Sequence, residues 1–232
     1  MSACRCRTTG DPLRAPVQDG GTVTLNGKVY SFGGTDGSDP LFKAYVHDPA
    51  TGGWQRLANM PQALEKPGAE AVDGQIYVFG GWTVTGAASA AVYRYDPTHG
   101  TWSTAASLPS PVVAGGTAVL GGRIYVMAGC GGNCVPASQA TYVYDPRTDT
   151  WSRAADYPVR DSWQSCAGID GRVVCAGGTD PVDGTELAST FSLDPVTGAW
   201  TARPTCPTPT GPWPLPLPAP GCSLSAASAA ER

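Results

Sequence analysis

The sequence has little of what most enzyme active sites require. Only two histidines occur in 232 residues, and His47 and His99 lie in separate segments, so they are not expected to share a metal ion. The chain also lacks a Gly-x-Ser-x-Gly nucleophile elbow, a phosphate loop and a His-Glu-x-x-His helix. These absences argue against several hydrolase and nucleotide-binding classes. We therefore expect no catalytic residues, no cofactor and no bound metal.

Charge and long apolar runs are also scarce. Charged residues make up 15% of the chain and the net charge is −4, so nucleic acid is not an expected partner. No apolar run approaches the roughly 18 residues of a membrane span, so none is expected. The first seven residues are basic but lack an apolar segment behind them, so they do not form a recognisable signal peptide.

What the chain has in abundance is glycine, proline and one repeated order of signals. An Asp-Pro pair recurs in steps of 48, 49 and 49 residues, and a tryptophan follows each aspartate by six residues. A glycine signal precedes each Asp-Pro pair. The marks are Gly33-Gly34, Asp48 and Trp54; Gly80-Gly81, Asp96 and Trp102; Ala128-Gly129, Asp145 and Trp151; and Gly177-Gly178, Asp194 and Trp200.

Each repeat contains the pattern of a four-stranded antiparallel sheet. A first and a second strand are separated by a two-residue turn of the type that needs positive φ at both positions. A third strand should end at the Asp-Pro pair, because proline cannot continue the ladder, and a fourth should begin near the tryptophan. The expected strand pairs are 22–25 with 29–32, 70–72 with 76–79, 117–120 with 124–127, and 165–169 with 173–176.

A period near 50 with these marks resembles the kelch repeat of the galactose oxidase and kelch superfamily. The resemblance implies an all-β fold, a kelch-type β-propeller with four four-stranded antiparallel blades. The tryptophans and the strand tyrosines Tyr45, Tyr93 and Tyr142 are expected between adjacent blades. The repeats are expected at residues 17–61, 62–109, 110–158 and 159–203.

The two ends of the chain carry no repeat signal. Residues 1–16 are expected to be a leader or linker, and residues 204–232 a proline-rich, disordered tail. Because kelch propellers usually have six or seven blades, four repeats predict an incomplete propeller. The sequence Arg203-Pro204-Thr205-Cys206-Pro207 stands where earlier repeats have a Pro seven residues after the Trp. One choice of codons would restore that proline in another reading frame, so the tail is a candidate out-of-frame segment.

Four of the eight cysteines fall inside the repeats as two close pairs. A two-residue turn at Asp170-Gly171 would place Cys166 opposite Cys175, and a short loop separates Cys130 from Cys134. Disulfides at both places would imply an oxidising compartment and a secreted parent protein. The alternatives are buried thiols in a cytoplasmic protein or, less well supported, a metal site at the Cys-x₃-Cys pair.

Binding residues are expected on loops at one end of the propeller, because rigid scaffolds carry function on loops. Trp82 and Trp163 stand outside the repeated tryptophan position, although partial packing between blades is an alternative role for both. Close carboxylates near Asp36 and Asp180 do not match a calcium-loop spacing, so no metal is expected there. The candidate binding residues are Asp36, Lys66, Trp82, Asn133, Arg160, Trp163 and Asp180.

The sequence thus predicts a non-catalytic kelch propeller fragment that binds protein or carbohydrate through loop surfaces. It resembles the kelch regions of secreted bacterial multidomain proteins, some of which accompany enzyme domains. Two alternatives are open: a fragment of a propeller enzyme of the galactose oxidase or sugar-epimerase type, and an intracellular adaptor. The histidine and tyrosine copper ligands of galactose oxidase have no matching positions in this sequence.

Overall fold

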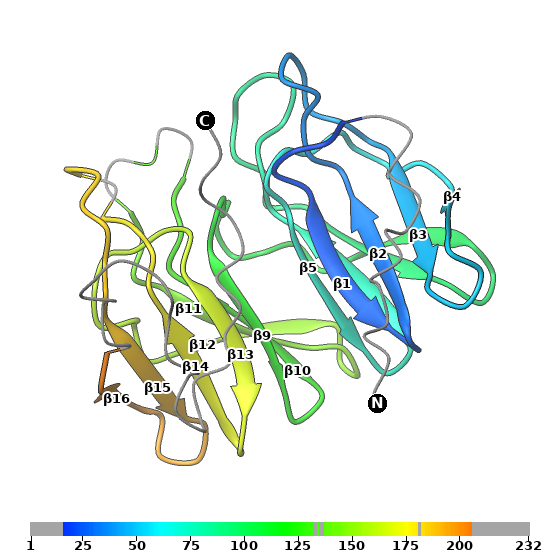
Figure 1. The fold of residues 1–232 in the computed structure, drawn as a ribbon. Helices are drawn as coiled ribbons and strands as arrows, with labels where there is room; N and C mark the ends of the chain where they lie inside the picture. Colours follow the sequence, from blue (N-terminus) through cyan, green and yellow to red (C-terminus); the bar gives the residue numbers. More distant parts are fainter. Residues whose placement is uncertain (1–15, 132–133, 135–136, 181, 206–232) are drawn as a thin grey trace, which may run out of the picture.

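The computed structural model describes residues 16–131, 134, 137–180 and 182–205, and this part of the chain is built of strands without helices (Figure 1). The strands form four antiparallel sheets of four strands each, arranged as the blades of a β-propeller. Each sheet follows the chain order from the innermost to the outermost strand. Blade 1 contains β1 (Gly21–Leu25), β2 (Lys28–Phe32), β3 (Ala44–Asp48) and β4 (Gly53–Arg56); blade 2 contains β5 (Gly68–Val72), β6 (Gln75–Phe79), β7 (Val92–Asp96) and β8 (Thr101–Ala105); blade 3 contains β9 (Gly116–Leu120), β10 (Arg123–Met127), β11 (Thr141–Asp145) and β12 (Thr150–Ala154); blade 4 contains β13 (Ser165–Ile169), β14 (Arg172–Ala176), β15 (Thr190–Asp194) and β16 (Ala199–Arg203).

The expected fold, strand order and turns are confirmed. In the first hairpin both turn residues have positive φ, 51° at Asn26 and 74° at Gly27, as a type I′ turn requires. The same holds for the three other hairpins, and each third strand ends at its aspartate. At Asp48 the carboxylate accepts a hydrogen bond of 2.9 Å from the Ala50 N–H and pairs with Lys28 at 3.0 Å. The aspartate therefore closes the turn after β3 and ties it back to β2.

Adjacent blades pack face to face through apolar clusters. Between blades 1 and 2 the cluster includes Phe32, Val46, Ile76 and Tyr95, all buried. Two further clusters join blade 2 to blade 3 and blade 3 to blade 4. Three of the four repeated tryptophans take the expected interblade role, whereas Trp54 packs on His47. The tyrosines whose rings contact those three are Tyr95, Tyr144 and Tyr157. Of the three tyrosines expected there, Tyr93 packs between blades 1 and 2, while Tyr142 is buried and Tyr45 is half-buried.

The glycine pairs couple each blade to the next. The N–H of Gly34 donates to the Leu64 carbonyl at 2.8 Å, and the N–H of Gly81 donates to the Val112 carbonyl at 2.9 Å. A side chain at Gly80 would collide with the Val112 carbonyl. Glycine is needed at Gly80 because the backbones approach this closely and its φ is 66°.

The two outermost sheet faces differ from the buried ones. Alternate residues of blade 1 point away from blade 2. At four strand positions they are more polar than the corresponding residues of blade 2, whereas Val29 and Tyr45 match Ile76 and Tyr93 in character. The four pairs that differ are Thr22 and Ala69, Thr24 and Ala71, Ser31 and Val78, and His47 and Tyr95. On the far face of blade 4, Val174 and Ala176 occupy the strand positions of Tyr30 and Phe32. Both end faces thus present less apolar surface than the interfaces between described blades.

Candidate functional site

The loops predicted to carry binding residues do meet at one end of the propeller, the upper end in Figure 1. In each blade, the segment that enters the first strand pairs with the segment after the glycine pair. Examples are the bridges between Glu65 and Trp82 and between Ser162 and Thr179. Both loop sets therefore border the central channel at this end.

A ring of four residues in left-handed conformation surrounds the channel mouth. They occupy the same place in each blade, two residues before the first strand, and their φ angles lie between 52° and 63°. The ring residues are Asp19, Lys66, Ala114 and Trp163. They line a pocket of about 410 Å³ at the entrance. A tryptophan is costly in this conformation, by about 1–2 kcal/mol, because its Cβ approaches the following carbonyl.

Lys66 connects the two tryptophans that were singled out in the sequence. Its Nζ lies 5.1 Å from the ring centroid of Trp82 and 5.2 Å from that of Trp163. The same ammonium is 3.6 Å from a carboxylate oxygen of Asp19. Cation–π attraction and the ion pair hold the Lys66 side chain across the mouth. We call Asp19, Lys66, Trp82 and Trp163 the mouth surface.

The remaining predicted residues lie around this surface rather than in it. Arg160 is exposed on the loop that enters blade 4. Asp36 and Asp180 each cap their own loops: Asp36 accepts a hydrogen bond of 3.1 Å from the Ser38 N–H, and Asp180 accepts one from the Val182 N–H. Asn133 lies outside the described residues. Asp19 was missed in the sequence, although its place two residues before a first strand matches that of Lys66.

Buried Asp161 was not predicted as a site residue, yet its position is unusual. It stands where the other entering loops have the buried apolar residues Leu64 and Val112. One carboxylate oxygen accepts a hydrogen bond of 3.0 Å from the Thr179 N–H, and the other has no partner among the described residues. Burial raises the pKa of Asp161 to about 7, because desolvation penalises the carboxylate. Comparing the four entering loops would have revealed this residue.

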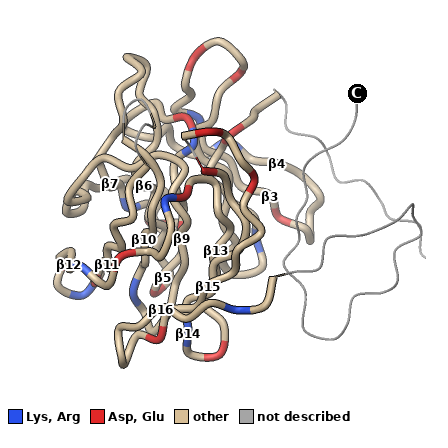
Figure 2. Tube along the Cα trace, turned by 90° about the vertical axis from the view of Figure 1, so that its left-hand side faces the viewer, with Lys and Arg blue, Asp and Glu red and all other residues tan. Residues whose placement is uncertain are grey.

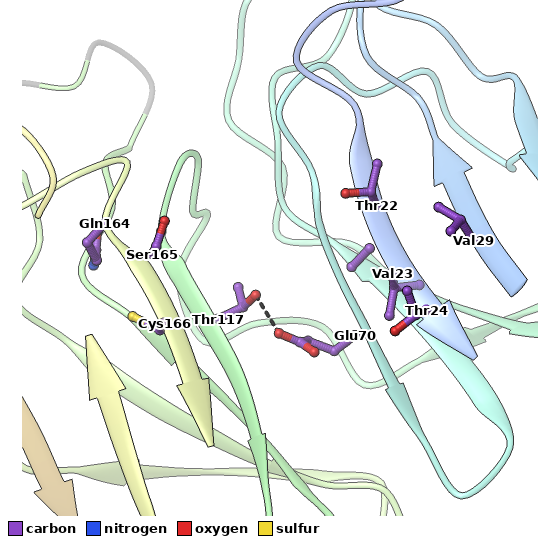
Figure 3. Close-up of a pocket in the computed structure, with 11 residues that line it drawn as sticks. Thr22, Val23, Thr24, Val29, Glu70, Thr117, Gln164, Ser165 and Cys166 are labelled. Atoms are coloured by element: carbon purple, nitrogen blue, oxygen red, sulfur yellow. Dashed lines mark hydrogen bonds between the residues drawn. The ribbon is translucent and has the colours of Figure 1, made fainter. Parts of the chain in front are cut away.

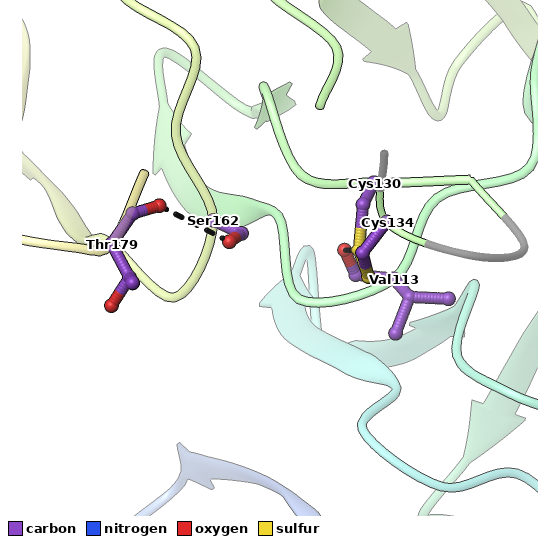
Figure 4. The surroundings of a disulfide bond; sticks show 5 residues. All are labelled: Val113, Cys130, Cys134, Ser162 and Thr179. Atoms are coloured by element: carbon purple, nitrogen blue, oxygen red, sulfur yellow. Dashed lines mark hydrogen bonds between the residues drawn. A yellow bond between two sulfur atoms is a disulfide. The ribbon is translucent and has the colours of Figure 1, made fainter. Parts of the chain in front are cut away.

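Both expected cysteine pairs are disulfide-bonded in the structure. Cys166 and Cys175 are cross-strand partners whose Cα atoms lie 4.1 Å apart, in the register that the Asp170-Gly171 turn sets. Cys130 and Cys134 have Cα atoms 4.5 Å apart, and Cys130 lies next to Val113 (Figure 4). Because Val113 belongs to the loop that enters blade 3, this disulfide lies at the same end of the propeller as the candidate surface.

Below the mouth, the innermost strands border a space of about 730 Å³, which we call the channel (Figure 3). Among the described residues that line it, most side chains are small or carry a hydroxyl group, and Glu70 is the one charged residue. The lining residues are Thr22, Val23, Thr24, Val29, Ala69, Glu70, Gly115, Thr117, Gln164, Ser165 and Cys166.

The histidines and acidic residues do not assemble a metal centre within the described part of the chain, where no three potential ligands come together. The His47 ring packs 5.1 Å from that of Trp54, and His99 contacts the Asp96 carboxylate at 2.7 Å. In addition, no helix among the described residues is long and apolar enough to cross a membrane.

The repeated blades, the glycine pairs that bond each blade to the next, and the channel define a kelch-type β-propeller. Sequence comparison matches residues 22–216 to the KLHDC2/KLHL20/DRC7 Kelch-repeats domain. Since this match covers most of the chain, the protein belongs to that kelch-repeat family.

Individual relatives match smaller parts. Kelch-like protein 25 of Xenopus tropicalis is 35% identical over 80 residues, 34% of this chain and 14% of the relative. Kelch-like protein terF of Aspergillus terreus is 33% identical over 81 residues, 32% of this chain and 18% of the relative. The matched segments thus span less than a fifth of either relative. The solved structure of YjhT superposes with a TM-score of 0.75 and 19% identity, covering 87% of this chain and 69% of that one. At this identity, the likeness concerns the fold.

Proposed function

We propose that this kelch propeller is a non-catalytic interaction module that binds a protein partner through its mouth surface. The observation that carries the proposal is the placement of Lys66 between Trp82 and Trp163. The Trp163 residue is 46% exposed although its backbone is in the costly left-handed conformation. An exposed, strained aromatic side chain adds little to folding, whereas tryptophan is enriched among residues that dominate binding energy.

Charge around the mouth suggests the chemistry of the partner. The loops of this end carry more acidic than basic residues, and acidic positions are prominent on them in Figure 2. The acidic residues are Asp19, Asp36, Asp39, Glu65, Asp161, Asp180, Asp183 and Glu186, against the basic Lys43, Lys66 and Arg160. Complementary potential would favour a partner with a basic contact surface. A carbohydrate, the other ligand class that the sequence predicts, would stack on Trp163 without needing positive charge.

The test compares binding by the wild type with that of Trp163→Ala and Lys66→Met. Val196→Ala is the matched control, because Val196 is 92% exposed in the turn between β15 and β16, at the end opposite the mouth. Proteins captured from source-cell extract are identified by mass spectrometry, purified and titrated by calorimetry, and a glycan array is probed in parallel. We expect to identify a partner protein that binds the wild type. Its affinity for both mouth variants should be at least tenfold lower, and its affinity for the control variant should be unchanged. The proposal would be contradicted if both mouth variants bind as tightly as the wild type, or if only glycans bind.

We also propose that the parent protein is secreted, with the two disulfides as the supporting feature. Alkylation of free thiols before lysis, followed by mass spectrometry, should find Cys166 and Cys175 protected in protein recovered from outside the cell. Recovery only from the cytoplasm with alkylated thiols would favour the adaptor alternative.

A further inference from the structure

Glu70 is a charged residue at a strand position where the other three blades have an apolar residue. It is the third residue of β5, and the same position holds Val23 in β1, Ala118 in β9 and Ala167 in β13. An apolar residue there packs against the next blade, so folding does not require a carboxylate. One blade therefore places an ionisable group where the others place a small apolar one.

The surroundings of Glu70 satisfy only part of its hydrogen-bonding capacity. Its Oε1 accepts a hydrogen bond of 2.7 Å from the Thr117 hydroxyl of the neighbouring blade (Figure 3). Among the described residues no second hydrogen bond and no salt bridge to this carboxylate is found. Burial raises its pKa, and the Thr117 hydrogen bond offsets this only in part. The carboxylate is thus uncompensated by positive charge.

The described lining of the channel offers Glu70 room and polar contacts but no cationic side chain. The other lining side chains are neutral, and Thr22, Thr24 and Ser165 add hydroxyl groups to the same space of about 730 Å³. Lys66 lies four residues earlier on the same blade, at the mouth, where Asp19 and the two indole rings hold its ammonium. The charge that would complement Glu70 must therefore come from outside the described chain.

We propose that the channel binds an organic cation, an alkylammonium or guanidinium group, with Glu70 as its counter-ion and the channel hydroxyls as additional acceptors. Such a group donates several hydrogen bonds and carries the missing charge. It can belong to a free small amine or to a lysine or arginine side chain of a peptide. The site lies within the channel, so the inference holds whether or not the mouth surface binds a protein.

The experiment follows the Glu70 carboxyl carbon by ¹³C NMR in glutamate-labelled protein. The free cations are methylammonium and methylguanidinium chloride, the peptide probes are end-capped Gly-Lys-Gly and Gly-Arg-Gly, and glucose is a neutral polyol. We expect at least one cation to shift the Glu70 signal saturably and to lower its pKa. A matched concentration of sodium chloride corrects for ionic strength. Tighter binding by the free cations assigns the site to small amines, and tighter binding by the tripeptides assigns it to side chains.

Two variants make the outcome decisive. Glu70→Gln keeps the size and an acceptor for Thr117 but removes the charge, so cation affinity should fall at least tenfold. Asp73→Asn removes a carboxylate from the turn between β5 and β6, at the end opposite the mouth and outside the channel lining, and should bind as the wild type does. The proposal is wrong if no cation perturbs Glu70, if Glu70→Gln binds equally well, or if only glucose binds. The pKa change in the wild type decides the matter even if Glu70→Gln fails to fold.

Discussion

The indole N–H of Trp151 donates a hydrogen bond of 2.8 Å to the carbonyl of Ala106, which lies on the preceding blade. Trp102 and Trp200 make the same bond to Ala58 and Ala155, one blade back in each case. The repeated tryptophan thus joins its own fourth strand to the end of the previous blade. Trp54, in the first described blade, packs on His47 instead.

This difference predicts that the same substitution lowers the free energy of unfolding by different amounts at Trp151 and at Trp54. Trp151→Ala should lower the free energy of unfolding by about 2–4 kcal/mol, because it removes half-buried ring area and leaves the Ala106 carbonyl without its donor. Trp54→Ala should cost less than about 1 kcal/mol. Urea denaturation of both variants measures the difference. Equal losses would show that the bond to the preceding blade is not what makes this residue important.

A second prediction concerns the glycine pair. Gly80→Ala should destabilise the protein by more than about 3 kcal/mol, because the new Cβ would meet the Val112 carbonyl as well as adopt an unfavourable φ. Gly86→Ala is the control: its φ is 74°, but a Cβ there would meet nothing within 4 Å. Gly86→Ala should lower the free energy of unfolding by only about 1–2 kcal/mol, the penalty of a left-handed backbone conformation for alanine. Similar thermal midpoints for the two variants would argue against the close approach.

The raised pKa of Asp161 predicts a pH-dependent stability. A carboxyl whose pKa is 3.8 when unfolded and about 7 when folded binds its proton more tightly in the folded state. Its contribution is therefore complete below pH 4 and is lost as the pH rises towards 7, by at most roughly 4 kcal/mol. Asp96 has its pKa lowered to about 2, so its contribution changes only below pH 4 and does not oppose the trend in this window.

The measurement is urea denaturation of the wild type and of Asp161→Asn between pH 4 and pH 7.5. The variant cannot ionise at this position, so its stability should depend less on pH, with Glu70 leaving a residual slope of the same sign. Wild type and variant curves that run parallel across this range would contradict the assignment to Asp161.

The disulfides give a fourth prediction. The Cys166–Cys175 bridge closes a loop with a sequence separation of 9, for which chain entropy predicts a stabilisation of about 2–3 kcal/mol. The double variant Cys166→Ala and Cys175→Ala should lose about that much relative to the oxidised protein. The matched variant at Cys130 and Cys134, with a separation of 4, should lose less. No change on adding dithiothreitol would show that the purified protein does not contain these bridges.

The repeat largely determined the fold from the sequence, because each of its marks acts locally. Positive φ at Asn26-Gly27 fixes a two-residue hairpin, the Asp-Pro pair ends a strand, and alternation assigns side chains to faces. The register that brings Cys166 opposite Cys175 follows from the turn alone. The sequence also predicted that the entering loops and the loops after the glycine pairs share one end of the propeller.

What the tertiary structure decided is which of these residues act together. Lys66, Trp82 and Trp163 come from different blades or loops, and only the circular arrangement of the blades brings the ammonium between the two rings. In the same way, Glu70 looks like an ordinary strand residue until the structure shows that the described lining of the channel holds no cationic neighbour. Asp161 differs from Leu64 and Val112 when the entering loops are compared in the sequence, but only the structure shows that its carboxylate is buried. Local backbone preferences fix strands and turns, whereas burial and charge balance arise from contacts between segments far apart in the chain.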